Sequence, residues 1–252
     1  MKSDLESPLV ENKLLVIIPF YNVEEHLEEA IEGVLQQTYQ NFHLVLVDDA
    51  STDGSKKIAE QYKNNDKISL LYNSENKGCY YSVNKALHAF KDKEWDYWHF
   101  HGGDDVSDLN RIQKVMDYLT LNPKVIGCKT TYVRVHYDTK EVDILDGQPH
   151  IGTSEGIAFY SRTAFDNLGY YDNTRFSGDT DYFWRLGAWI DTNKLDYELG
   201  AHEECLYIAY IRETNLTIQY DWTHDRPQYW SKIREEIKTQ MVPNNNFYRE
   251  IF

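Results

Sequence analysis

The sequence predicts an α/β protein built on a mostly parallel sheet that is flanked by helices. Through the first half of the chain, short apolar runs alternate with segments whose apolar residues recur at helical spacing, which is the pattern of strand–helix–strand units. Residues 14–19 and 42–47 are apolar almost throughout, as in strands that are buried on both faces. A chain of 252 residues with 41% hydrophobic side chains can bury one sizeable core.

Four strand-and-helix units fill this first half. Strands are expected at residues 14–19, 42–47, 68–72 and 95–100. Asn22 is expected to open the first helix, with Glu25 three residues later as in a capping box. The apolar face of that helix would be Leu27, Ile31, Val34 and Leu35. Further helices are expected at residues 55–62, 81–90 and 109–119, the last with Ser107 as its N-cap.

The second half is less regular and predicts a smaller, mixed part of the fold. Residues 125–137 are rich in β-branched and aromatic side chains and predict one or two strands, whereas residues 140–150 resemble a loop. A short strand is expected at residues 156–160, followed by a helix that Ser161 caps and Gly169 ends. A helix through Phe183 and Ile190, a strand at residues 206–211 and an amphipathic helix at about residues 226–240 complete the prediction.

Composition excludes several classes of partner. With 41 acidic and 26 basic residues the formal charge is −15, which repels nucleic acid phosphates, so no nucleic acid partner is expected. The longest apolar run, residues 14–21, is far shorter than the roughly 20 residues that span a bilayer, and residues 1–4 lack the apolar core of a signal peptide. We therefore expect a cytoplasmic protein without a transmembrane segment. The three widely spaced cysteines predict reduced packing residues.

Acidic residues stand at three places that the predicted fold makes informative. Asp48-Asp49 follows the second strand, Asp104-Asp105 follows the fourth strand after two glycines, and Asp179 precedes a helix. Ligands of parallel sheets bind outside the carboxyl ends of the strands, so the loops after residues 19, 47 and 100 should gather at one edge. Carboxylates there suit Mg²⁺ or Mn²⁺, although each motif also fits a turn followed by a helix.

These motifs together closely resemble glycosyltransferase family 2, with its GT-A fold and Rossmann-like sheet. The resemblance rests on residues 16–22 (VIIPFYN), 46–55 (LVDDASTDGS) and 102–105 (GGDD), and it covers roughly residues 12–220. It implies that Pro19 and Tyr21 line the nucleotide pocket and that Asp48 and Asp49 recognise the base, commonly uracil. A carboxylate can accept the uracil imide N–H, and a tyrosine ring can cover the base. Alternatively, Asp49 or Asp53 only caps the next helix.

The resemblance also assigns the diphosphate side of the site. Asp104 falls on the family's metal-binding position, where Mn²⁺ or Mg²⁺ bridges the donor diphosphate, and Asp105 is expected beside the donor. The family motif usually begins with another aspartate, which is Gly102 here, so a sugar or ribose contact is in doubt. His101 could compensate, but a packed imidazole is the commoner outcome. Lys77 falls where the family places polar residues near the nucleotide and could meet phosphate, although it is equally a solvated surface lysine. Arg212 falls in the family's late Tyr-Arg segment and could bind diphosphate or organise the closing loop.

Asp179 falls on the position of the family's catalytic base. A base there would take the proton from an acceptor hydroxyl as the oxygen attacks the anomeric carbon. Gly178 stands where the family usually has a glutamate. The structural alternative for Asp179 is an acid favoured by the helix dipole. Asp181 is a weaker candidate base. Arg185 could tie the helix to the site, with a structural ion pair as its default. Residues 152–156 resemble the family's loop that shapes the acceptor side, and Glu155 there could contact a sugar hydroxyl.

The resemblance thus predicts a metal-dependent inverting glycosyltransferase that moves a sugar from a nucleotide-sugar donor, most often a UDP-sugar, to a hydroxyl of a saccharide or other acceptor. We expect one domain over residues 1–252, with a nucleotide-binding half at about 12–106 and an acceptor half at about 107–220. A nucleotide-sugar-binding protein without transfer activity is the main alternative, because two expected carboxylates are glycines. A nucleotidyltransferase would normally carry a glycine-rich basic loop where residues 20–25 are acidic and lack glycine.

Overall fold

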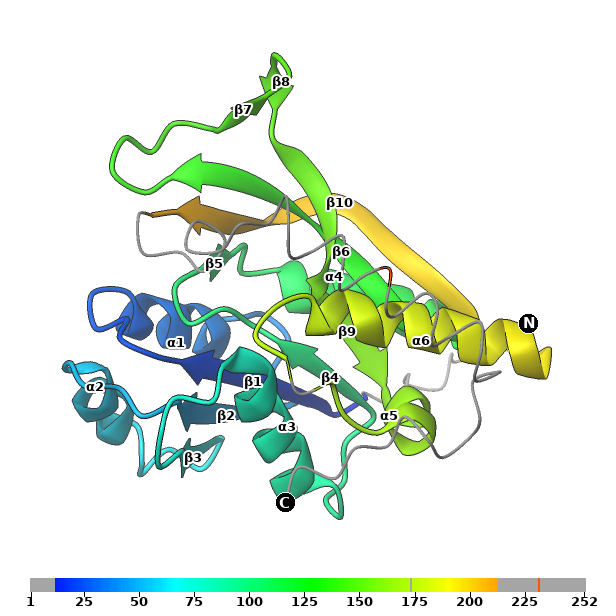
Figure 1. The fold of residues 1–252 in the computed structure, drawn as a ribbon, viewed down its shortest axis with the longest axis horizontal. Coiled ribbons are helices and arrows are strands. Elements are labelled where there is room, and N and C mark those ends of the chain that lie inside the picture. The colour runs from blue at the N-terminus through cyan, green and yellow to red at the C-terminus, as the bar shows by residue number, and fades with distance from the viewer. Residues whose placement is uncertain (1–11, 173, 213–230, 232–252) are drawn as a thin grey trace, which may run out of the picture.

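The computed structural model describes residues 12–172, 174–212 and 231 of the chain. Its main feature is an eight-stranded sheet with the strand order β3-β2-β1-β4-β9-β6-β10-β5 (Figure 1). The strands are β1 (Leu14–Phe20), β2 (Phe42–Asp48), β3 (Ile68–Tyr72), β4 (Tyr97–Phe100), β5 (Val106–Ser107), β6 (Val125–His136), β9 (Ile151–Ser161) and β10 (Glu198–Ile211). The helices are α1 (Leu27–Leu35), α2 (Ser55–Gln61), α3 (Cys79–Phe90), α4 (Arg111–Leu121), α5 (Arg162–Leu168) and α6 (Gly178–Asn193). A mostly parallel sheet flanked by helices confirms the predicted fold class.

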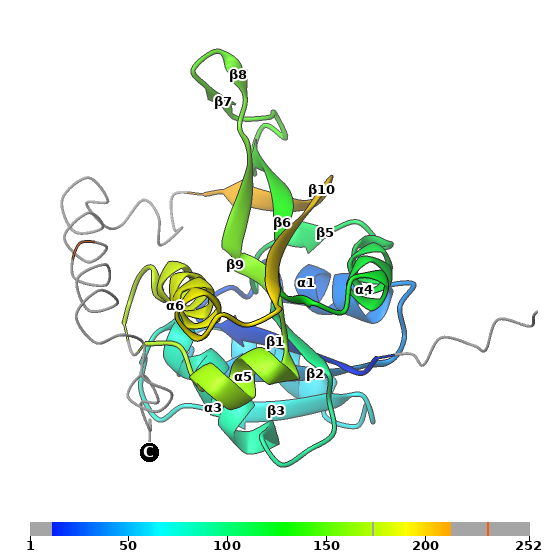
Figure 2. The same cartoon turned by 90° about the vertical axis from the view of Figure 1, so that its right-hand side faces the viewer.

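Strands β3, β2, β1 and β4 form a parallel half-sheet in which β1 is buried throughout and β2 and β4 nearly so, whereas the edge strand β3 is mostly half-buried. Along β1 the side chains alternate: Leu15 and Ile17 pack with α3, α5 and α6, whereas Val16 and Ile18 pack with α1 and α4. Figure 2 shows these two groups of helices on opposite sides of the sheet. Because both faces are covered, polar groups can meet a ligand only where the strands end.

Strand β9 joins this half-sheet to the rest of the sheet, because it pairs antiparallel with β4 on one side and with β6 on the other. Strand β6 pairs in parallel with β10, whose other edge meets β5. Two of these strands are longer than predicted, since β9 begins at Ile151 and β10 at Glu198. The prediction of a loop at residues 152–156 was therefore wrong. That segment is polar and contains two glycines, so its strand conformation depends on its neighbours.

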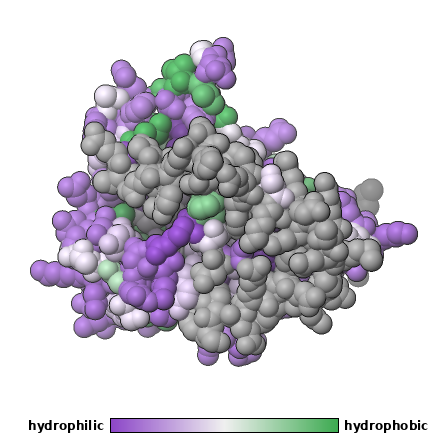
Figure 3. All heavy atoms as spheres, viewed as in Figure 1, coloured by the Kyte–Doolittle hydropathy of each residue, from purple (hydrophilic) through white to green (hydrophobic). Residues whose placement is uncertain are grey.

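Residues 140–150 were predicted as a loop but contain a small hairpin. Strands β7 (Ile144–Leu145) and β8 (Gln148–Pro149) pair around Asp146-Gly147, both of which have positive φ. An Asp-Gly pair with this backbone is a typical hairpin turn, and that signal was missed. The hairpin projects from the body of the molecule (Figures 1 and 2). Its exposed apolar side chains form a green patch in Figure 3, made by Val142, Ile144, Leu145 and Ile151.

The predicted start of the first helix was wrong. Helix α1 begins at Leu27, and Asn22 makes no cap for it. Instead Asn22 has a positive φ of 51°, its backbone N–H donates to Ser51 Oγ at 3.2 Å, and its side-chain oxygen accepts from Thr52 N at 2.8 Å. The capping-box pattern was outcompeted by contacts with the next loop, because the two loops meet in the fold.

The predicted N-cap at Ser107 was also wrong, since Ser107 lies in β5 and α4 begins at Arg111. Gln37 Oε1 accepts from Ile112 N at 3.0 Å, so a side chain from just after α1 satisfies the start of α4. In contrast, the predicted cap of α5 is confirmed, because Ser161 Oγ accepts from Ala164 N at 3.2 Å. No helix in the described ranges is long and apolar enough to cross a bilayer. The helix predicted at residues 226–240 lies, except for residue 231, outside the described residues.

Candidate active site

The loops after β1, β2 and β4 meet at one edge of the sheet, as predicted. The N–H of Asp49, after β2, donates to the carbonyl of Phe20 at the end of β1, with a distance of 2.9 Å. Gly103, after β4, lies against the same strand: a Cβ added there would be 3.1 Å from Phe20 Cβ and 3.2 Å from the Pro19 carbonyl oxygen. A side chain at residue 103 would therefore push these loops apart by a few tenths of an ångström, and glycine allows their close approach.

Asp48 and Asp49 are both buried but have different surroundings. Asp49 accepts three hydrogen bonds, from Asn73 Nδ2, Lys77 N and Gly78 N, at 2.7, 2.8 and 2.7 Å. It therefore holds the loop that leads into α3. Asp48 Oδ1 accepts from Ser51 N at 2.9 Å. Among the described residues, no hydrogen bond to Asp48 Oδ2 is formed, so Asp48 retains acceptor capacity that Asp49 has largely used.

The other residues predicted on the nucleotide side differ in exposure. Tyr21 is 42% exposed directly after β1, so its ring is open to a ligand. Pro19 is buried in β1, beyond the last β1 residue that pairs with β4. The Lys77 ammonium forms an ion pair with Glu75 on the surface. This contact agrees with the alternative of a solvated lysine, while the Lys77 backbone is held by Asp49.

Asp104 and Arg212 are brought together although they are far apart in the sequence. Arg212 Nη1 lies 3.0 Å from Asp104 Oδ2, and the arginine side chain is only 7% exposed. The guanidinium also lies over the rings of Tyr137 and Tyr210, at 4.4 and 4.8 Å from their centroids. The predicted metal ligand is thus paired with a cation from the end of β10.

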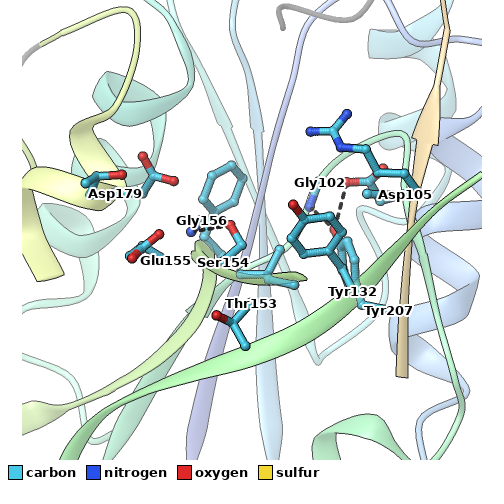
Figure 4. Close-up of a pocket in the computed structure, with 14 residues that line it drawn as sticks. Gly102, Asp105, Tyr132, Thr153, Ser154, Glu155, Gly156, Asp179 and Tyr207 are labelled. Carbon is cyan, nitrogen blue, oxygen red and sulfur yellow. Dashed lines mark hydrogen bonds between the residues drawn. The ribbon is translucent and has the colours of Figure 1, made fainter. Parts of the chain in front are cut away.

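Asp105 is held by Tyr207, a residue that the sequence analysis did not single out. Tyr207 OH accepts from Gly102 N at 3.1 Å and donates to Asp105 Oδ2 at 2.9 Å, as the dashed lines in Figure 4 show. The N–H of Tyr210 donates to Asp105 Oδ1 at 3.2 Å. Burial, together with the neighbouring Asp104 carboxylate, raises the pKa of Asp105. The space beside Gly102 is filled by this contact, since a Cβ there would lie 2.5 Å from Asp105 Oδ2.

A buried arginine packs against Tyr207, the residue that holds Asp105. Arg111, the first residue of α4, is fully buried, and its guanidinium carbon lies 4.6 Å from the ring centroid of Tyr207. Its Nη1 donates to His99 Nε2 at 2.9 Å, so His99 is neutral, with its Nδ1 proton donated to the Ala158 carbonyl. Burial and Arg111 hold the pKa of His99 well below its ordinary value and lower that of His101 to about 3. Both imidazoles are therefore packed and neutral, which is the outcome that the sequence favoured.

A cavity of about 400 Å³ extends from these residues to the start of α6. Its lining includes Gly102, Asp105 and Tyr207 on one side and Ser154, Glu155 and Asp179 on the other (Figure 4). Asp179 is in the first turn of α6, and its Oδ1 accepts from Tyr80 OH at 2.7 Å. Glu155 Oε1 lies 3.5 Å from Lys129 Nζ. The predicted base thus shares one cavity with the residues after β4.

Asp181 has a different environment from Asp179. It is buried and forms an ion pair with Arg185 one turn later, with Nη2 and Nε of the arginine at 2.8 and 2.9 Å from Asp181 Oδ2. Arg185 Nη2 also donates to the Tyr170 carbonyl at 3.1 Å. This agrees with the structural role expected by default for Arg185. Asp181 does not line the cavity.

The described residues contain no group of three or more His, Cys, Asp or Glu side chains that could hold a metal ion. Arg212 contacts Asp104 at Oδ2, so Oδ1 of Asp104 can accept a metal, whereas both oxygens of Asp105 are engaged by Tyr207 and Tyr210. A single carboxylate can bind Mg²⁺ or Mn²⁺ when substrate phosphates and waters supply the other ligands. The residues present therefore fit a metal that arrives with a diphosphate.

Sequence reasoning missed Tyr80, Tyr207 and Arg111. Tyr80 and Asp179 are 99 residues apart, and Tyr207 and Asp105 are 102 apart, so no local pattern relates them. The only available signal for Tyr207 was that it lies in the strand predicted at residues 206–211.

Comparisons with known proteins show what the chain is similar to. The model of the glycosyl transferase family 2 matches residues 15–183. An uncharacterised glycosyltransferase of Haemophilus influenzae is 30% identical over 250 residues, which cover 88% of this chain and 76% of that protein. The putative glycosyltransferase EpsE of Bacillus subtilis is 41% identical over 109 residues, or 42% of this chain. The matched part of the chain spans 38% of EpsE and 24% of glycosyltransferase GlyA of Streptococcus pneumoniae.

Solved structures share the fold. Residues 1–349 of Staphylococcus aureus TarS, in complex with UDP-GlcNAc, align with a TM-score of 0.69 at 18% identity, covering 92% of this chain and 67% of that one. The mannosyltransferase PcManGT from Pyrobaculum calidifontis, in complex with GDP-Man and Mn²⁺, aligns with a TM-score of 0.62 at 16% identity, covering 92% and 63% of the two chains. At these identities the likeness concerns the fold.

Proposed function

Because the chain belongs to glycosyltransferase family 2 and has the GT-A fold, we propose that it is an inverting transferase that moves a sugar from a nucleotide-sugar to a hydroxyl group. The donor we propose is a UDP-sugar, and the acceptor a saccharide or another hydroxyl compound. Residues 12–106 would hold the nucleotide, and the residues that follow would form the acceptor side.

On the nucleotide side, we assign base recognition to Asp48 and Tyr21. The Asp48 carboxylate retains acceptor capacity for the imide N–H of uracil, and the half-exposed Tyr21 ring can cover the base. Asp49 would act beside them by holding residues 77 and 78 in place. The Lys77 side chain is a weaker candidate for a phosphate contact, since it already forms an ion pair with Glu75.

On the diphosphate side, Asp104 would hold Mn²⁺ or Mg²⁺ together with the donor diphosphate. When bound, the metal neutralises charge on the leaving diphosphate. Arg212 would then exchange at least part of its contact with Asp104 for the diphosphate, because a guanidinium binds phosphate oxygens well. Asp105, with Tyr207, would keep the loop in place at Gly102.

In the transfer step, Asp179 would act as the general base. Its carboxylate accepts the proton of the acceptor hydroxyl as that oxygen bonds to the anomeric carbon. The bond between the anomeric carbon and the diphosphate oxygen breaks at the same time, and its electron pair leaves with the nucleoside diphosphate. A one-step displacement of this kind inverts the anomeric configuration.

A single observation carries the proposal: Asp179 lines the same cavity as Asp105, the neighbour of the proposed metal ligand. A cavity of about 400 Å³ suits a sugar-sized group between a base and a diphosphate site. Glycines at residues 102 and 178, where carboxylates are expected, instead favour the second candidate, a protein that binds a nucleotide-sugar without transferring it.

A donor panel tests the proposal. UDP-, GDP- and dTDP-sugars would be assayed for nucleotide release with and without Mn²⁺, and UDP affinity would be titrated in parallel. We expect release from a UDP-sugar that depends on the metal. Tight UDP binding without turnover across the panel would favour the binding protein instead.

Two variants separate the roles of the carboxylates. Asp179→Asn should abolish transfer and leave UDP affinity nearly unchanged, because only the base is lost. Asp104→Asn should weaken UDP binding in the presence of Mn²⁺ and change it little without metal. Full transfer activity in Asp179→Asn would exclude it as the base.

A further inference from the structure

We propose that Tyr80 is a positioning residue for Asp179, and that residue 178 is a glycine because a larger side chain would displace Tyr80. The inference rests on the proposed role of Asp179 as the base. Tyr80 is in the first turn of α3, and Asp179 is in the first turn of α6, so the contact joins two helices across the site.

The hydrogen bond itself is short and enclosed. Tyr80 OH donates to Asp179 Oδ1 at 2.7 Å, and Tyr80 is only 7% exposed. Burial and the adjacent Asp179 carboxylate raise the pKa of Tyr80 well above its ordinary value, so the hydroxyl stays protonated and remains a donor. The Tyr80 ring packs edge-on against Tyr171, with 5.2 Å between centroids, which limits its rotation. One carboxylate oxygen is thus fixed by a rigid donor.

Two glycines leave the room that this contact needs. A Cβ at Gly178 would lie 2.9 Å from Tyr80 Cγ and within 3.1 Å of both Cδ atoms. A Cβ at Gly156, on β9, would lie 2.8 Å from Asp179 Oδ2. A glutamate at residue 178 therefore cannot coexist with Tyr80 in this position. The glycine at residue 178, where the family usually has a glutamate, therefore leaves the space that the Tyr80 ring occupies.

The start of α3 is in turn fixed from the nucleotide side. Asp49 accepts from the N–H groups of Lys77 and Gly78, and Gly78 immediately precedes the helix with a φ of 95°. Tyr80 follows two residues later. The loop after β2 and the proposed base are therefore connected through a short, hydrogen-bonded segment of backbone.

Titratable groups from several elements surround Asp179. Tyr80 and Cys79 approach from α3, Glu155 and Tyr160 belong to β9, and Tyr171 precedes α6. Burial raises the pKa of the Cys79 thiol to about 12, so it stays protonated. Among these groups, Tyr80 donates a hydrogen bond to the Asp179 carboxylate. Its removal should raise the pKa of Asp179, since a donor to the ionised form is lost.

The test compares Tyr80→Phe with Tyr171→Phe. Both changes remove one hydroxyl from the same buried aromatic group, but the Tyr171 hydroxyl has no hydrogen-bond partner among the described residues. For Tyr80→Phe we expect kcat to fall about ten- to a hundredfold with the donor KM unchanged. The acid limb of the kcat–pH profile should also move up by roughly one pH unit. Tyr171→Phe should leave kcat, KM and the pH profile unchanged.

Further measurements distinguish the possible outcomes. Thermal unfolding and UDP titration show whether each variant is folded. If Tyr80→Phe does not fold, Gly178→Ala replaces it in the test. Its added methyl group presses on the Tyr80 ring, so it should lower kcat and move the acid limb of the pH profile. Equal kcat and pH profiles in wild type, Tyr80→Phe and Tyr171→Phe would overturn the inference. Asp179→Asn in the same series keeps the proposed function separate: if it is inactive while Tyr80→Phe is unaffected, the base stands and the positioning role fails.

Discussion

Restoring the first aspartate of the metal motif should damage this protein. In Gly102→Asp, the new Cβ would lie 2.5 Å from Asp105 Oδ2, 3.1 Å from Asp105 Cγ and 3.2 Å from Tyr207 OH. Asp105 must then move, although Tyr207 OH and Tyr210 N hold it at 2.9 and 3.2 Å. The motif that is usual in the family is therefore sterically incompatible with this loop.

The magnitude follows from the bonds that must break. Losing one hydrogen bond to a half-buried carboxylate costs about 1.5 kcal/mol, which corresponds to roughly a tenfold change in an equilibrium constant. We expect Gly102→Ala to lower the free energy of unfolding by about that amount, since the methyl group alone causes the clash. Gly102→Asp should lose more, because it adds a third negative charge beside Asp104 and Asp105.

Urea unfolding and titration of UDP with and without Mn²⁺ measure both effects. Gly33→Ala is the matched control, because a Cβ there meets nothing within 4 Å, and it should not be destabilised. UDP binding in the presence of Mn²⁺ should be no tighter in Gly102→Asp than in wild type. Tighter binding with an unchanged free energy of unfolding would refute this reasoning.

Two further predictions concern stability. The unfolded chain protonates His99 and His101 below a pKa of about 6.5 while the fold keeps both neutral, so the free energy of unfolding should fall with decreasing pH, by about 1.4 kcal/mol per unit for each. The raised pKa of Asp105 has the opposite effect on the free energy of unfolding and offsets the contribution of about one histidine. Urea unfolding at pH 6.5 and 5.5 should still show a lower free energy of unfolding at the lower pH. In His99→Gln this decrease should be smaller. Asp181→Asn should cost about 3–5 kcal/mol, because the buried Arg185 loses its counter-charge. Asp166→Asn, which breaks an exposed pair at the same spacing, should cost less than about 1 kcal/mol, and equal losses would contradict the argument.

The parallel half of the sheet could be predicted because its strands are short apolar runs, and its central strands are buried on both faces. Strand β1 begins at Leu14 and β3 spans residues 68–72, as their apolar runs indicate. Helix starts were less predictable where a distant side chain replaces the local cap. The Gln37 side chain accepts a hydrogen bond from a backbone N–H at the start of α4, and Asn22 bonds to the loop after β2. The local capping patterns were therefore misleading, because contacts that form only in the fold replace them.

The carboxylates of the candidate site were proposed from sequence motifs, but the side chains that hold them could not be predicted. Asp49 and Asp179 lie in recognisable sequences, whereas nothing near Tyr80 in the sequence indicates that it meets Asp179. The difference between Asp48 and Asp49 was also hidden, because hydrogen bonds from residues 73, 77 and 78 decide which carboxylate keeps acceptor capacity. Contacts between distant segments carry this information.

Strand β9 constrains how the specificity of this protein can be redesigned. Its first half lines the cavity with Ser154 and Glu155, and its second half places Phe159 against His99 in the core, with ring centroids 4.1 Å apart. A substitution made in β9 to admit a new acceptor therefore also perturbs the pairing that holds the core together. We expect laboratory evolution of acceptor preference at this strand to select compensating stabilising mutations elsewhere, whereas changes at the exposed Tyr21 should be accepted without them.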